Sequence, residues 1–323
     1  RCDCYSCIPG FDSRQYSSFR DSPRAASAMI EERSPQARRL IALGLMAAGS
    51  TAISFGGLVI RNIEHADEWQ LVFYRAIGML ISISIILMLR YRRHTIFRIR
   101  DIGWPGVIGS LLVATASISF VQSITHTTVA NSLFMLCAIP FISAALARIL
   151  LQEALPGRTI FTMALAAAGI LIMLVEGVGS GSVFGNVMGL LTAVSFATYA
   201  VIVRWRREVD MLPVLVLSSV FIIVSGAIVT GGALGVPLRD IVLCLLWGGV
   251  LSGFANWMFI VASRQLIAAE VTLVMQLEFV LGPIWVWLFI NEAPAQLTLI
   301  GGSLVLGAVL YRAMAELRRA KPN

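Results

Sequence analysis

Ten apolar segments, each close to the length of a membrane-spanning helix, follow one another along most of this chain. A helix needs about 20 mostly apolar residues to cross the hydrocarbon core of a bilayer. Hydrophobic residues make up 58% of the 323 residues and charged residues only 13%, which leaves too little charged surface for a soluble domain. The sequence therefore predicts an all-α membrane protein that lies in the lipid bilayer. The expected spans are 39–60, 69–90, 102–122, 128–151, 159–176, 185–204, 212–230, 241–261, 268–290 and 296–312.

The arginines are distributed unevenly between the two sides that ten spans would create. The N-terminal flank, the even-numbered connections and the C-terminal tail carry most of them. The opposite side has only Arg61 and Arg239, close to four acidic residues. Because positive charge accumulates in cytoplasmic loops, both termini are expected in the cytoplasm, and the expected location is the bacterial inner (plasma) membrane. The net charge of +7 is thus interpreted as a topology signal, and no nucleic-acid partner is expected.

The two ends of the chain differ from the rest in composition. Residues 1–38 are mostly polar and are expected to form a disordered cytoplasmic extension, and one hypothesis is that the functional protein starts near Met29. A basic cytoplasmic tail, 313–323, is expected after the last span. Cys2, Cys4 and Cys7 lack a fourth ligand, so no metal site is expected there.

The segments 129–156 and 272–294 share one plan, in which an apolar run is followed by a Gln-Glu or Asn-Glu pair and a proline. The two glutamates, Glu153 and Glu292, lie 139 residues apart and are expected to be structural. Ten spans divide into two sets of five, and an odd number in each set inverts the second set relative to the first. We therefore expect two inverted five-helix repeats, 39–176 and 185–312, as in many secondary transporters. The alternative is that any two apolar helices ending in polar loops look alike.

These features resemble the drug/metabolite transporter superfamily, specifically its EamA-type ten-helix members. The resemblance is carried by Arg75 within WQLVFYRAIGML, by residues 131–170 and by residues 270–310. It covers roughly 37–312 and implies a bundle that exports or exchanges small metabolites, often amino acids or related compounds. Family members often have Glu-Pro in helix nine, whereas here Phe279 follows Glu278 and the proline comes later, at Pro283. The shape of the helix at this point therefore departs from the family pattern.

Two charged side chains lie inside expected spans. Glu278 is near the middle of 268–290, where a carboxylate costs at least ~2.5 kcal/mol on insertion scales, so it should face a cavity or a partner. It is predicted to accept a proton or contact a cationic group, with a structural hydrogen bond as the alternative. Arg75 lies about a turn and a half inside 69–90. It either binds a carboxylate or extends to the membrane interface, and the sequence favours neither.

Polar residues recur on one face of the third and eighth expected spans, either along an aqueous path or in hydrogen bonds between helices. The third span carries Ser119 and Gln122 on such a face, and the eighth carries Asn256 beside Trp257. Asn131 and Gln276, on the fourth and ninth spans, complete the predicted set. The substrate-binding residues predicted from the sequence are Glu278, Arg75, Ser119, Gln122, Asn131, Asn256, Trp257 and Gln276, around a cavity between spans 2, 3, 4, 8 and 9.

The sequence contains no hydrolase, metalloprotease or phosphate-loop motif, so neither an enzyme nor a cofactor is expected. We expect a secondary transporter that exports a small amino acid-like or cationic compound by alternating access, with protons as a coupling partner. Uptake or exchange of a nucleoside- or cofactor-like compound is the alternative, followed by a non-transporting membrane subunit. Both a monomer and a homodimer are compatible with the sequence.

Overall fold

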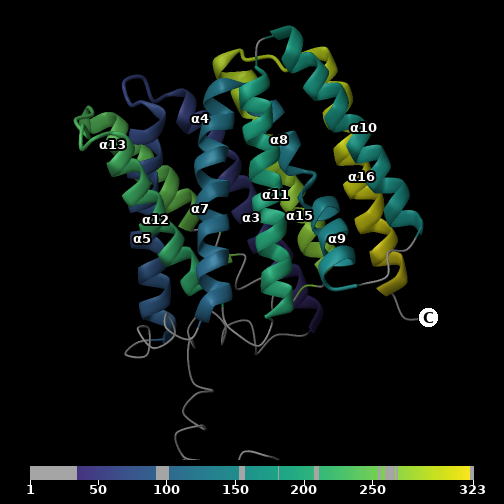
Figure 1. Ribbon diagram of the computed structural model, residues 1–323. Coiled ribbons are helices and arrows are strands. Elements are labelled where there is room, and N and C mark those ends of the chain that lie inside the picture. The colour runs from purple at the N-terminus through teal and green to yellow at the C-terminus, as the bar shows by residue number, and fades with distance from the viewer. Residues whose placement is uncertain are drawn as a thin grey trace, which may run out of the picture.

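The computed structural model contains a single bundle of helices (Figure 1). It describes residues 35–91, 102–152, 157–180, 182–206, 211–253, 255, 257–258, 266 and 268–320. Helices and the turns between them make up this part of the chain, and no strand occurs in it. The predicted all-α class is confirmed for these residues. Asn256, Glu153 and the predicted extension up to residue 34 lie outside them.

The helices occur in the following order along the chain. They are α3 (Pro35–Ser54), α4 (Gly56–Arg61), α5 (Glu68–Tyr91), α7 (Gly103–His126), α8 (Val129–Leu136), α9 (Ile139–Leu150), α10 (Gly157–Ser180), α11 (Val183–Trp205), α12 (Pro213–Val229), α13 (Leu238–Leu245), the π-helical turn η3 (Leu246–Leu251), α15 (Ala268–Ile290) and α16 (Gln296–Ala320).

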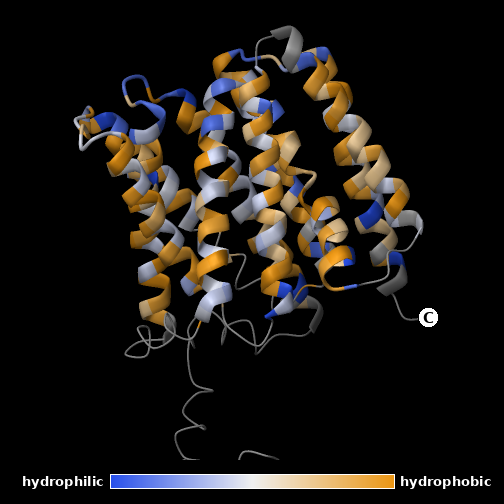
Figure 2. Ribbon diagram, in the orientation of Figure 1, coloured by the Kyte–Doolittle hydropathy of each residue, from blue (hydrophilic) through white to orange (hydrophobic). Residues whose placement is uncertain are grey.

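Eight helices in the described ranges are long and apolar enough to cross a membrane, with α3–α4 and α8–α9 each counted as one span. The seventh expected span corresponds to α12, which is shorter at 17 residues. The eighth corresponds to α13 and η3 and continues into residues that are mostly not described. Figure 2 shows hydrophobic residues along the lengths of the helices and hydrophilic ones mainly near the ends. The chain is therefore a membrane protein, while the count of ten spans stays a prediction.

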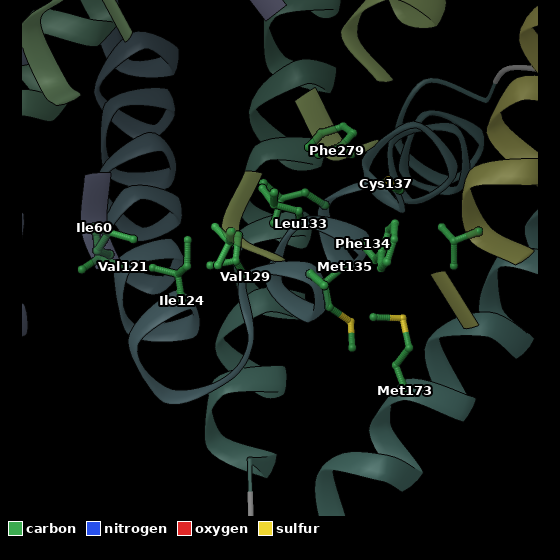
Figure 3. Packing of buried hydrophobic residues seen from close by; sticks show 14 of the residues in the cluster. Ile60, Val121, Ile124, Val129, Leu133, Phe134, Met135, Cys137, Met173 and Phe279 are labelled. Carbon is green, nitrogen blue, oxygen red and sulfur yellow. The ribbon is translucent and has the colours of Figure 1, made fainter. Parts of the chain in front are cut away.

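Each helix of the bundle packs against several others. The helix α12 lies against α5 and α7, and α11 lies against α7, α8 and α9. At one side of the bundle α10 packs along α16 (Figure 1). Helix α15 packs along α3. The buried interior gathers side chains from α4, α7, α8, α10 and α15, including Val121, Leu133, Met135, Met173 and Phe279 (Figure 3). The core thus joins elements that are far apart in the sequence.

Two spans are each interrupted between two α-helices. Phe55 separates α3 from α4, and residues 137–138 separate α8 from α9, with Pro140 in the first turn of α9. Pro140 fits the start of α9, because proline cannot donate the backbone hydrogen bond of a helix interior. Pro283, in contrast, lies inside an uninterrupted α15. Such breaks place backbone groups and side chains of mid-membrane residues within the protein interior, where they can be satisfied.

Candidate functional site: a cavity beside Glu278

A cavity of about 180 Å³ lies between α3 and α15. Seven described residues line it, namely Met46, Gly49, Ser50, Ile53, Ala255, Met275 and Glu278. The wall is mostly apolar, with the Ser50 hydroxyl and the Glu278 carboxylate as its polar side chains. Glu278 thus faces a cavity, as expected from its position in an apolar span. The first expected span forms much of the wall, whereas the sequence predicted a cavity between spans 2, 3, 4, 8 and 9.

The Glu278 carboxylate makes no hydrogen bond or salt bridge within the part of the chain that the structure describes. It interacts with Arg75 only through the longer-range Coulomb attraction between the two charges. A charge inside a bundle is costly unless a partner compensates for its lost hydration. A cationic group or a proton that entered the cavity would supply that compensation, so the arrangement can bind either.

Arg75 points into the bundle. Its Nη1 donates a hydrogen bond to Ser117 Oγ over 2.7 Å, and its guanidinium lies 4.3 Å from the centre of the Trp247 ring. Its Nε is buried without a hydrogen-bond partner. The structure therefore favours an inward role over extension to the membrane interface. A guanidinium that stacks on an indole and keeps one N–H available can bind a carboxylate.

The other predicted site residues lie away from the cavity. Ser119 and Gln122 are buried on α7, and the Ser119 hydroxyl donates to the Thr115 carbonyl oxygen one turn earlier. Gln276 is buried on α15, two residues before Glu278, and Trp257 is 38% exposed. None of these four residues lines the cavity as the described residues form it. The polar stripe on α7 therefore lies within the helix bundle in this structure.

Asn131 belongs to a buried polar network between helices. Its amide donates to Thr127 Oγ1 over 3.2 Å and to the side-chain oxygen of Asn186 on α11. Thr298 on α16 lies 3.4 Å from Asn131 Oδ1 and donates to Glu176 Oε2 on α10 over 2.6 Å. The network thus connects four helices and occupies the hydrogen-bonding groups of Asn131. The spacing of polar residues along a single helix could not indicate Asn186 or Thr298, because their hydrogen-bond partners are distant in the sequence.

Two ion pairs at the ends of the α3–α15 helix pair were also not predicted. Arg39 Nε lies 2.7 Å from Glu270 Oε1, and Arg61 Nε lies 2.7 Å from Glu292 Oε2. Glu270 is buried. The expected structural role of Glu292 is consistent with its ion pair. The sequence shows a charged residue at each end of both spans, but the arginines indicated topology and Glu292 indicated a structural role.

Part of the chain matches a known protein family. Residues 40–175 match the EamA-like transporter family. This match confirms the resemblance, over α3 to α10, and indicates a membrane transporter of the drug/metabolite type. No curated protein matches the chain.

The fold of this chain is also found in solved structures. One of them, titled only "Crystal structure of protein", has a TM-score of 0.59 and 15% sequence identity. The alignment covers 88% of this chain and 100% of the other. At this identity the likeness shows the fold alone, and it extends well beyond the residues that match the family.

Proposed function

We propose that this chain is a secondary transporter that exports a small cationic or amino acid-like metabolite across the bacterial inner membrane by alternating access. Glu278 binds the ammonium group of the substrate, or a proton that is exchanged for it. The observation that carries the proposal is the Glu278 carboxylate, which faces the cavity and has no hydrogen-bond or salt-bridge partner among the described residues. The EamA match supports the class of transporter but not the substrate.

The cavity supports the choice of a small substrate. Its volume of about 180 Å³ is below the range of about 300–1,000 Å³ that is usual for pockets of drug-sized ligands. Met46, Ile53 and Met275 give it an apolar wall that suits the hydrocarbon part of an amine. Flexible methionine side chains adapt to different shapes, so a wall of this kind suits related amines of different form.

Helix packing supports two inverted five-helix repeats, and the arginine distribution supports both termini in the cytoplasm. If the second repeat begins at α11, the pairs α5–α12 and α10–α16 each join a helix to its own counterpart. In the same way, the contact between α3–α4 and α15 has its counterpart in the contact between α11 and α8–α9. The contact between α5 and α13–η3 has its counterpart in the contact between α12 and α7. Such exchanged pairs are expected around a pseudo-two-fold axis.

The backbone supports the repeat as well. Gln152 and Asn291, which precede Glu153 and Glu292, have φ angles of 55° and 60°. They are the two non-glycine residues with positive φ in the described part of the chain. A left-handed residue is a common way to end a helix, but it is unfavourable for side chains other than Asn and Gly. Its recurrence at equivalent positions favours a common local structure.

The test is substrate-driven proton flux in proteoliposomes that contain a pH-sensitive dye. Polyamines, aromatic cations and amino acids are added in separate pools to wild type and to Glu278→Gln. Glu64→Gln is the matched control, because Glu64 is an exposed carboxylate paired with Arg239 at the protein surface. We expect a pool-specific pH change in wild type and in the control that is lost in Glu278→Gln. An equal flux in all three proteins would reduce Glu278 to a structural residue.

A further inference from the structure

The two ion pairs at the ends of the α3–α15 helix pair have the same composition. In each, an arginine of the first span pairs with a glutamate of α15 or of the residues directly after it. Arg39 and Glu270 form the pair at one end, and Arg61 and Glu292 form the pair at the other. The cavity that contains Glu278 lies between them along the same two helices. Each pair thus lies between this cavity and one end of the two helices.

The register of the two helices is constant over this distance. Arg39–Glu270 and Arg61–Glu292 each join residues 231 positions apart, and so does the hydrogen bond from Trp285 Nε1 to Ser54 Oγ at 2.9 Å. Two helices that keep one offset over their whole length run parallel and side by side. The α3–α15 interface thus extends from one ion pair to the other.

The break at Phe55 divides this interface into two parts. Arg39 and the cavity residues Met46 to Ile53 are on α3, whereas Arg61 is on α4. Phe55 itself stacks on Trp285 with ring centres 5.0 Å apart, between the cavity and Arg61. A rotation of the backbone at Phe55 would move α4 without displacing Arg39. The interruption thus allows the two ends to respond separately.

The Arg61–Glu292 pair also contacts the connection between α7 and α8. Arg61 Nη2 donates to the Thr127 carbonyl oxygen over 2.9 Å, and the Val129 backbone N–H donates to Glu292 Oε1 over 2.8 Å. Four groups from three parts of the chain therefore meet at this end. At the other end the Glu270 side chain is 7% exposed while that of Arg39 is 59% exposed, so water already reaches one side of the pair.

We propose that Arg39–Glu270 and Arg61–Glu292 are the two gates of the transport path, and that they open alternately on opposite faces of the membrane. The inference rests on the transport function proposed above. A partly buried carboxylate is costly without its arginine unless water replaces the lost contact. Each pair therefore separates where its end of the path becomes hydrated, and the intact pair keeps the opposite end closed.

The experiment measures access to the cavity from each face. Ser50→Cys is introduced into a protein in which Cys2, Cys4 and Cys7 are serine, and the buried Cys137 and Cys244 are retained. A membrane-impermeant maleimide is applied to right-side-out and to inside-out vesicles. The same background without the Ser50→Cys change gives the rate of unrelated labelling. The result is the ratio of the labelling rates from the two faces.

Arg39→Gln and Arg61→Gln are expected to shift this ratio in opposite directions, each by at least about fivefold, as for a coupling between two states. Arg239→Gln is the matched control, because Arg239 pairs with Glu64 at 2.9 Å on exposed surface and is not on the α3–α15 helix pair. It should leave the ratio unchanged. Arg61→Lys keeps the positive charge and should retain most of the wild-type ratio.

Ratios that shift in the same direction in both variants, or that match Arg239→Gln, would overturn the proposal. Poor folding lowers the amount of labelled protein but not the ratio, which is measured on the monodisperse fraction alone. The measurement needs no substrate, so its failure is distinct from a failure of the proposed function. If the labelling ratios were unchanged but the flux still depended on Glu278, the gate proposal would be rejected and the proposed transport function would be retained.

Discussion

Gly301→Ala on α16 is expected to separate two helices that meet backbone to backbone. A Cβ added at Gly301 would lie 2.5 Å from the Gly169 carbonyl oxygen, and one added at Gly169 would lie 2.5 Å from the Gly301 carbonyl oxygen. A backbone oxygen cannot rotate away as a side chain does, so α10 and α16 must move apart. This movement loses dispersion contacts along the whole interface.

The magnitude follows from two opposing effects. Overpacking against a fixed atom costs about 2–3 kcal/mol, at the upper end of the usual range. Alanine gains about 1 kcal/mol over glycine as a helix former. The free energy of unfolding should thus fall by about 1–2 kcal/mol. Gly307→Ala is the matched control in the same helix, because a Cβ there would meet nothing within 4 Å. Only the higher helix propensity of alanine then affects the stability of this variant.

The assay is thermal unfolding in detergent, followed through the reactivity of the buried thiols of Cys137 and Cys244 toward a fluorogenic maleimide. The midpoint should fall by several degrees for Gly301→Ala, at about 2–4 °C per kcal/mol, and should rise for Gly307→Ala. Two variants that shift the midpoint equally would refute the reasoning, because they differ only in what the new methyl group meets.

Two further substitutions test the polar interior. Asn131→Ala leaves the side-chain oxygen of Asn186 without its donor, so the free energy of unfolding should fall by about 1–3 kcal/mol in the same assay, with the substrate preference of the flux unchanged. Arg75→Lys cannot keep both the hydrogen bond to Ser117 and the stacking on Trp247. Flux should therefore fall about tenfold, which corresponds to a loss of about 1.4 kcal/mol of binding free energy. Wild-type flux in Arg75→Lys would make Arg75 a packing residue.

The positions of most spans could be predicted from the sequence, because a long apolar run is a local property. Helix ends were less predictable. The span expected at 159–176 belongs to a helix of 157–180, and the one expected at 296–312 belongs to a helix that ends at Ala320. Polar residues outside the apolar core continue a helix in water at no hydrophobic cost. The break at Phe55 had no proline to indicate it, whereas the break near Pro140 did.

Glu278 could be predicted for a different reason, since a single carboxylate in an apolar run is conspicuous whatever surrounds it. Its cavity could not be predicted, because Met46, Gly49 and Ser50 look like ordinary lipid-facing or packing residues. Their role depends on the parallel pairing of α3 with α15, which joins residues 231 positions apart. The same pairing turns charges at the ends of spans into ion pairs. The cavity and the ion pairs both depend on how two distant helices are aligned in the fold, and no local stretch of the sequence specifies that alignment.

The separation of the two interior charges bears on the choice between a cation and an amino acid. Glu278 faces a cavity between α3 and α15, whereas the guanidinium of Arg75 is enclosed among Ser117, Phe120 and Trp247. A cation needs only the carboxylate, which already faces open space. An amino acid also needs Arg75, whose Nε is buried, so its carboxylate would bind only after α5 and η3 separate. We therefore expect cations to drive flux at lower concentration than amino acids, and Arg75→Lys to weaken the amino acid response more than the cation response.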